Sequence, residues 1–343
     1  MSIVDRQEVV VPNPNRFKVC DELVCRDLTK PAEQFLDRTG KRIRKSVVEL
    51  VFAMAGGSGQ LPPCLGEAIE WLHAGSLVID DIQDESPMRR GQPSLHMQIG
   101  VPLALNAGNW MYFQALEKLF DGSLHRKIQN RFVHHLVRTA LRCHRGQSLD
   151  LGTRVDQIER SNIPCIVTEI SRLKTGSLVS MAATFGAVSA EARRPLRVAL
   201  SRFGMQIGIA LQMRNDLEEL RSMTQDSNEF QTIRMEDLRN ARITWPWAWA
   251  YSLCSPDEFA ALLAQIPESR RDSRALSRLA TRLLSHSERC GDAAIQRRID
   301  HQFCRLAAHD VNGRALVEMK AVLKRISNPE RILGEENDAK LAN

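Results

Sequence analysis

Strand-forming patterns are scarce in this chain. Aromatic residues make up only 5% of it, prolines number 14, and runs of Val, Ile and Thr that alternate with polar residues are hard to find. Such alternation is the main signal of a sheet, whereas long stretches free of turn residues favour helices. The chain has 343 residues, 43% of them apolar, so it is long enough to bury a large core. The sequence therefore predicts an all-α fold with a single helical domain.

The eight cysteines are scattered singly and form no Cys-x-x-Cys pair. This pattern indicates neither a zinc site nor a disulfide framework. Single thiols are typical of a reducing compartment, so we expect a cytoplasmic protein. Residues 1–11 lack the apolar stretch of a signal peptide, and no apolar run approaches the length of a transmembrane span.

The net charge of +6 is modest and spread along the chain. Proteins that bind nucleic acid usually carry a basic stripe, often interleaved with aromatic residues, and no such stripe is found. We therefore expect no nucleic-acid partner. A dispersed positive charge is better suited to drawing small anionic substrates into a cleft.

Two acidic clusters lie far apart in the sequence. Residues 80–84 read Asp-Asp-Ile-Gln-Asp, and Asp80 and Asp84 stack on one helix face because a helix has about 3.6 residues per turn. The second cluster places four oxygen-bearing side chains at i, i+3, i+4 and i+7, namely Gln212, Asn215, Asp216 and Glu219. Crowded carboxylates repel one another unless cations lie between them. Grouped oxygen ligands with arginines close by indicate Mg²⁺ and a phosphate-bearing substrate.

The turn signals divide the chain into an irregular arm (1–16), a helical domain (17–329) and a polar tail (330–343). A basic loop is expected at 87–93 and a polar break at 222–228. Helices are predicted at 21–35, 40–55, 65–83, 103–119, 126–149, 164–186, 191–220, 257–266, 271–287, 291–309 and 312–325.

Six segments, in this order, resemble the motifs of the trans-isoprenyl diphosphate synthases, the polyprenyl synthetase family that includes geranylgeranyl and farnesyl diphosphate synthases. They are Gly40–Arg44, Leu72–Asp84, Ser86–His96, Gly146–Leu151, Lys174–Gly176 and Gln212–Glu219. Each of these residues taken alone could have a purely structural role; Lys41, for example, could be a solvated residue at the start of a helix. The co-occurrence of all six is what favours the family.

The resemblance implies an isoprenoid-synthase-type helical bundle around a deep central cavity. It implies a homodimeric enzyme that joins isopentenyl diphosphate head-to-tail to an allylic diphosphate and makes a trans-prenyl diphosphate. Mg²⁺, with about three ions once substrate is bound, would neutralise the departing diphosphate.

The resemblance also implies residue roles. Metal ligands would be Asp80, Asp84, Asn215, Asp216 and Glu219. Catalytic residues would be Asp80, Asp81, Asp84, Arg89, Lys174, Thr175, Gln212 and Asp216. Substrate-binding residues would be Lys41, Arg44, His73, Arg89, Arg90, Lys174, Gln212 and Arg242. Arginine's planar group matches phosphate oxygens, and lysine supplies a point charge.

Product length in this family depends on side-chain bulk just before the first acidic cluster. Gly75 and Ser76 stand there and neither is bulky, so a C20 product is favoured, with C15 or C25 as alternatives.

The second cluster departs from the family pattern. Asn215 stands for its first aspartate and Glu219 for its last, which removes one negative charge. Two alternatives therefore stay open beside condensation and other prenyl transfer. One is a class I terpene cyclase that acts on a preformed prenyl diphosphate, and the other is a non-catalytic partner subunit of a prenyl synthase.

Overall fold

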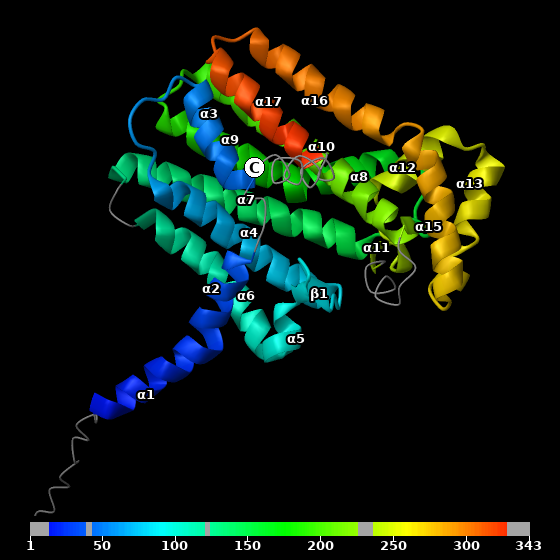
Figure 1. The fold of residues 1–343 in the computed structure, drawn as a ribbon, viewed down its shortest axis with the longest axis horizontal. Helices are drawn as coiled ribbons and strands as arrows, with labels where there is room; N and C mark the ends of the chain where they lie inside the picture. Colours follow the sequence, from blue (N-terminus) through cyan, green and yellow to red (C-terminus); the bar gives the residue numbers. More distant parts are fainter. Residues whose placement is uncertain (1–13, 39–42, 121–123, 226–235, 328–343) are drawn as a thin grey trace, which may run out of the picture. The chain divides into compact units, whose positions relative to one another are not determined.

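The computed structural model describes residues 14–38, 43–120, 124–225 and 236–327. Their regular structure is almost entirely helical, so the all-α prediction is confirmed (Figure 1). The chain divides into two compact units, and each is built from two separate stretches. The first unit joins Met1–Gly40 with Ala74–Tyr112, and the second joins Lys41–His73 with Phe113–Asn343.

The first unit begins with a helical segment that proline interrupts. α1 spans Pro14–Val24, a π-helical turn η1 spans Cys25–Thr29, and α2 spans Lys30–Asp37. Pro31 lies in the first turn of α2 and cannot donate a backbone hydrogen bond, so the regular ladder breaks just before it. Helix therefore begins before the predicted residue 21, and the last part of the predicted irregular arm is helical.

A close crossing of two helices forms the centre of the first unit. α4 (Pro63–Gln83) begins in the second unit and enters the first at residue 74, and α6 spans Val101–Glu117. A Cβ added at Gly75 would lie 2.8 Å from the carbonyl oxygen of Gly108, and one added at Gly108 would lie 2.7 Å from Ile79 Cδ1. Because Gly75 has no side chain, α4 and α6 can approach each other closely at this point. Gly75 therefore has a packing role between two helices, beside the chain-length role expected from the sequence.

The predicted basic loop is a small hairpin. β1 (Met88–Arg89) pairs antiparallel with β2 (Gln92–Pro93), and α5 (Leu95–Ile99) follows. The connecting residues Arg90 and Gly91 both have positive φ angles, 54° and 75°. Two consecutive residues in this region are the signature of a tight hairpin turn that asparagine and glycine normally fill.

The second unit contains a long helical run with a π-helical interruption. α8 (Ile163–Ser171), η4 (Arg172–Gly176) and α9 (Ser177–Ser189) follow one another directly, where one helix was predicted. α9 packs along α3 (Ile43–Met54). The glycine at position 186 permits this close approach, because a Cβ there would clash with the Val48 carbonyl oxygen. α17 (Gly313–Ser327) lies against α3 as well (Figure 1).

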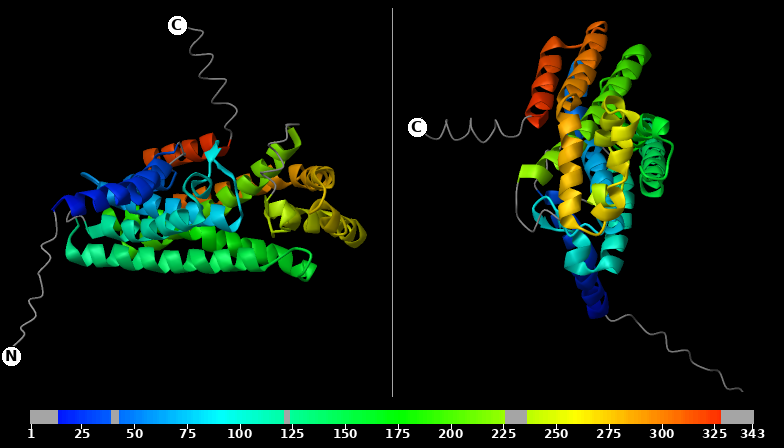
Figure 2. Two further views of the ribbon diagram at one scale, coloured as in Figure 1. Left: turned by 90° about the horizontal axis from the view of Figure 1, so that it is seen from below. Right: turned by 90° about the vertical axis from the view of Figure 1, so that its right-hand side faces the viewer.

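α10 (Arg194–Gln225) is the longest described helix and organises the second unit. It packs against α9, against α15 (Ser273–Glu288) and against α16 (Gly291–Ala307), whose orange ribbon runs beside the green α10 in Figure 2. It continues through Gln225, so the part of the predicted break at 222–225 is helical and the remainder lies outside the described residues. The other described helices are η2 (Lys118–Phe120), α7 (Arg126–Gly152), η3 (Arg160–Asn162), α11 (Glu236–Arg239), α12 (Trp245–Leu253), α13 (Pro256–Leu263) and α14 (Ile266–Ser269).

Among the helices of the described ranges, none combines the length and apolar character that crossing a membrane requires.

The role of Gly75 can be tested by adding a single methyl group. Gly75→Ala places that group against the backbone carbonyl of α6, which cannot move cheaply, and should destabilise the fold by ~1–3 kcal/mol. Gly152→Ala is the matched control, because no heavy atom lies within 4 Å of the added Cβ. We expect a lower thermal unfolding midpoint for Gly75→Ala and an unchanged or higher one for Gly152→Ala. Equal midpoints would show that the crossing is not tight.

Candidate active site

The first acidic cluster keeps its helical register to the end. The backbone amide of Asp84 donates to the carbonyl oxygen of Asp80 at 2.9 Å, although regular α4 ends at Gln83. The two carboxylates therefore lie one turn apart on one face, as predicted, and both side chains are partly exposed.

Asp81 turns inward and pairs with Arg89. Its side chain is fully buried, and Oδ1 accepts from Arg89 Nε at 2.6 Å and from Arg89 Nη2. Burial raises the pKa of the Asp81 carboxyl, and the Arg89 charge opposes that rise. Arg89 Nη2 also lies 3.7 Å from Asp80 Oδ2. Arg89, predicted to bind substrate, is thus oriented by the cluster itself.

The second cluster contains a chain of hydrogen bonds. The Thr175 hydroxyl donates to Gln212 Oε1 at 2.6 Å, and Gln212 Nε2 donates to Asp216 Oδ1 at 2.7 Å. The backbone amide of Trp245 donates to Asp216 Oδ2 at 3.0 Å. Burial raises the pKa of Asp216 to about 7, and these donors oppose the rise. Three predicted site residues are therefore brought together, and the carboxylate is held by neutral donors.

The π-helical turn η4 presents Thr175 to α10. A Cβ added at Gly208 would lie 2.6 Å from Gly176 Cα and 2.8 Å from the Thr175 carbonyl oxygen, so the two backbones touch. Gln212 follows one turn after Gly208 and meets the hydroxyl of Thr175. Single π turns inside helices are frequent at functional sites.

Asp150 is a site residue to which sequence reasoning gave no role. Its carboxylate oxygen Oδ2 lies 2.5 Å from Lys174 Nζ, and its backbone carbonyl accepts from Arg242 Nη1 at 2.8 Å. It therefore holds two predicted diphosphate-binding residues that are far apart in sequence. Its place inside the Gly146–Leu151 motif was the available signal, but the spacing alone does not reveal its partners.

The remaining predicted residues are spread over both units. Burial raises the pKa of the Cys143 thiol to about 12, and the charges of Arg44 and Lys174 oppose that rise. Both cations therefore lie near the thiol. His73 is partly exposed on α4. Lys41 lies outside the described residues.

The donor set suits a hard cation only in part. Asn215 is exposed, Glu219 is partly exposed and Asp216 is 8% exposed, so the predicted stripe is not uniform. Within the described residues no group of three acidic, histidine or cysteine side chains is close enough to hold an ion alone. Mg²⁺ typically binds through one or two carboxylates together with substrate phosphates, and the partly exposed Asp80 and Asp84 fit that requirement.

The all-helical fold and these paired acidic and cationic residues define an isoprenoid-synthase-type protein. Residues 25–282 match the polyprenyl synthetase family, which is most of the chain, and the protein belongs to that family.

Two curated relatives illustrate the similarity. A geranylgeranyl pyrophosphate synthase of Rhodocybe pseudopiperita is 32% identical over 184 residues, covering 52% of this chain and 50% of the relative. A geranylgeranyl diphosphate synthase of Sulfolobus acidocaldarius is 31% identical over 224 residues, covering 64% and 65%. The matches thus span between half and two thirds of these relatives. A polyprenyl synthase structure from Caulobacter crescentus superposes with a TM-score of 0.73 at 20% identity, over 91% of this chain and 94% of the other, which establishes the fold.

Removing Asp81 should destabilise the first unit. Asp81→Ala removes the closest partner of Arg89, whose side chain is 28% exposed, and losing hydrogen bonds to such a charged group costs about 2 kcal/mol. Asp27→Ala is the matched control, because it breaks the exposed Arg26–Asp27 pair, whose side chains are 69% and 36% exposed. Thermal unfolding should show a lower midpoint only for Asp81→Ala. Two equal midpoints would mean that the buried pair has no structural role.

Proposed function

We propose that this protein is a Mg²⁺-dependent prenyltransferase. It condenses isopentenyl diphosphate head-to-tail with an allylic diphosphate and makes a trans-prenyl diphosphate, with C20 the favoured length. The observation that carries this proposal is the hydrogen-bond chain from Thr175 through Gln212 to Asp216, with Lys174 held next to it by Asp150. Both relatives described above are named geranylgeranyl diphosphate synthases, which supports the C20 choice.

In this reaction the diphosphate group of the allylic substrate leaves as an anion, and an allylic cation remains. Diphosphate departs readily only when its charge is neutralised. Bound Mg²⁺ would neutralise that charge as a Lewis acid. About three ions are expected, and the residues that would hold them are Asp80, Asp84, Asp216, Asn215 and Glu219. Arg89 and Lys174 donate to the same diphosphate, and Arg242 adds a third cation.

The isopentenyl diphosphate is bound without metal, by cationic side chains. We assign Lys41, Arg44, His73 and Arg90 to it. Thr175 and Gln212 direct oxygen atoms at the allylic cation and stabilise it as it forms. Apolar helix faces around them exclude water, which would otherwise capture the cation. The released diphosphate accepts the proton that is lost after the new carbon–carbon bond forms.

Ser76 is the residue we assign to product length. Its neighbour Gly75 is buried against α6, whereas Ser76 is partly exposed. A small side chain at Ser76 leaves room for a growing prenyl tail, which agrees with a product longer than C15.

We further propose that the protein works as a homodimer in the cytoplasm. Val101 and Leu105 lie one turn apart on α6, and their side chains are 48% and 44% exposed. Apolar side chains that gather on one element and face water are typical of an interface between subunits.

The decisive measurement is product analysis with Mg²⁺ and geranyl, farnesyl or geranylgeranyl diphosphate, each with and without isopentenyl diphosphate. We expect longer prenyl diphosphates only when isopentenyl diphosphate is present. Asp80→Ala and Asp84→Ala should abolish turnover and leave the circular dichroism spectrum unchanged, because they remove ligands at a partly exposed helix end. Asp21→Ala, an exposed carboxylate on α1, is the control and should remain active.

Other outcomes have defined meanings. Hydrocarbons or alcohols formed without isopentenyl diphosphate would identify a terpene cyclase. No turnover with any substrate would favour a non-catalytic partner subunit. Full activity of both Asp80→Ala and Asp84→Ala would remove the metal assignment.

Asn215→Asp tests the unusual second cluster. The change restores one carboxylate at an exposed position, so half-maximal activity should require several-fold less Mg²⁺, with equal or higher turnover. Asn130→Asp adds the same charge at an exposed site on α7 of the second unit and should change neither value. If Asn215→Asp abolishes turnover or alters the product, the asparagine is a functional specialisation.

A further inference from the structure

Arg38 is a buried cation at the end of α2. It is only 9% exposed, and its guanidinium carbon lies 4.6 Å from the centre of the Phe35 ring. Its Nη1 donates to the backbone carbonyl of Pro93 at 2.9 Å. Arg38 thus connects the end of α2 to β2, the second strand of the β1–β2 hairpin, although the two residues are 55 positions apart in sequence.

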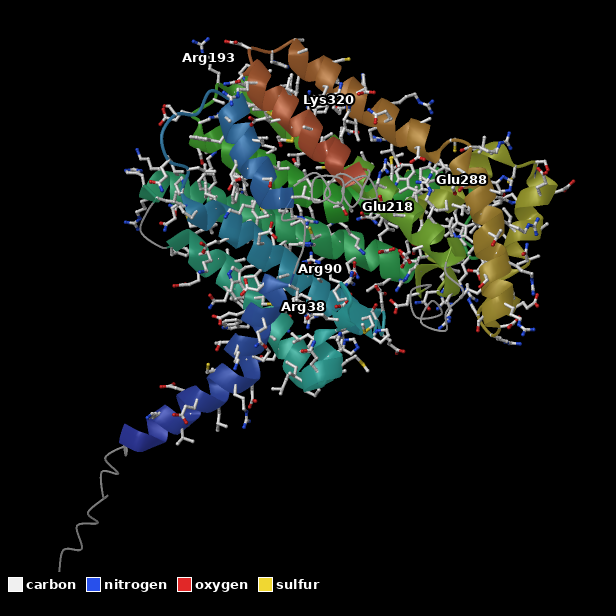
Figure 3. All side chains as sticks on the ribbon, viewed as in Figure 1. Arg38, Arg90, Arg193, Glu218, Glu288 and Lys320 are labelled. Atoms are coloured by element: carbon white, nitrogen blue, oxygen red, sulfur yellow. The ribbon has the colours of Figure 1, made fainter. Side chains whose placement is uncertain are left out.

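Arg90 is attached to Arg38 in the opposite direction. Arg90 Nη1 donates to the backbone carbonyl of Arg38 at 3.3 Å. The two contacts form a reciprocal clamp, in which Arg38 holds the hairpin by its side chain and holds Arg90 by its backbone. Figure 3 labels both arginines, and their labels are adjacent in that view.

The clamp acts on a strained residue. Arg90 has a φ of 54° at the first central position of the turn, a place where asparagine or glycine is preferred. An ordinary side chain in this region is unfavourable and persists only where surrounding contacts fix it. The Arg38 clamp supplies such contacts, and strain of this kind is concentrated at ligand-binding positions.

The charges around the clamp indicate its use. Asp81 is the acidic residue near Arg38, but its Oδ1 is engaged by Arg89. Burial lowers the pKa of the Arg38 guanidinium, the charge of Asp81 opposes that fall, and the charge of Arg90 adds to it. Guanidinium groups are well suited to bind the oxygen atoms of a phosphate-bearing anion.

We propose that Arg38 is a positioning residue that fixes the Arg90 guanidinium for the diphosphate of isopentenyl diphosphate. This inference rests on the proposed function, in which Arg90 binds that substrate. Arg38 itself is too buried to serve as a direct ligand, so its effect passes through Arg90 and the turn that carries it.

The test is a double-mutant cycle on the full chain. Arg38→Gln and Arg90→Gln should each raise the KM for isopentenyl diphosphate ~10-fold, the loss expected for one charged hydrogen bond. The KM for the allylic diphosphate should change less than ~2-fold, and Arg38→Gln with Arg90→Gln combined should be no worse than Arg90→Gln alone. Arg26→Gln, an exposed arginine of the same unit, should match the wild type.

Several results would overturn the inference. Additive effects of the two substitutions, or an equal rise in the KM for the allylic diphosphate, would show that Arg38 acts independently of Arg90. A fall in kcat with unchanged KM values would show a purely structural role. Arg38→Lys keeps the charge and one donor and serves if Arg38→Gln does not fold. It should recover KM to within ~3-fold of the wild type, and a KM as high as that of Arg90→Gln would contradict the clamp.

If the wild-type protein makes no product that depends on isopentenyl diphosphate, the proposed function is wrong and the assignment of Arg90 is lost with it. If the wild type is active and Arg38→Gln leaves the KM for isopentenyl diphosphate unchanged, only the role of Arg38 is wrong.

Discussion

A carboxylate is costly to bury unless a cation or several donors accompany it, and both acidic clusters meet this constraint inside their own unit. In the first unit the buried Asp81 pairs with Arg89. In the second unit Asp150, a partly exposed carboxylate outside the second cluster, pairs with Lys174. These pairings hold in place two cations that we assign to the diphosphate. Groups that are already oriented need little rearrangement when charge develops, which is the condition for effective electrostatic catalysis.

Asp216 departs from this arrangement. It is surrounded by neutral donors rather than paired directly with a cation, so its pKa rises to about 7, and its neighbour in sequence is the neutral Asn215. The second cluster therefore carries less negative charge near neutral pH than the first. We infer that Asp80 and Asp84 provide the stronger metal site, and that a cation bound next to Asp216 would lower its pKa and release its proton.

Sequence periodicity predicted most of the helices, because the burial of an amphipathic helix face is recorded locally in every turn. It failed where distant residues decide the structure. The π-helical turn at Arg172–Gly176 lies against Gly208, and Gly75 packs against Gly108. Motif order likewise selected Lys174, Gln212 and Asp216 as candidate site residues. The contacts of Arg38 and Asp150 are made with partners 55 and 24 residues away, which no spacing rule encodes.

Irregular backbone coincides with the residues assigned to substrate. Lys174 and Thr175 lie in the π-helical turn, Arg90 has a φ of 54°, and Ala241, with a φ of 53°, immediately precedes Arg242. Next to each irregularity one side chain makes a specific hydrogen bond: Thr175 with Gln212, Arg90 with Arg38 and Arg242 with Asp150. Backbone strain of this kind is concentrated at ligand-binding positions and persists only where surrounding contacts fix it. We infer that the contacts which hold these irregular segments matter to the site as much as the side chains assigned to substrate.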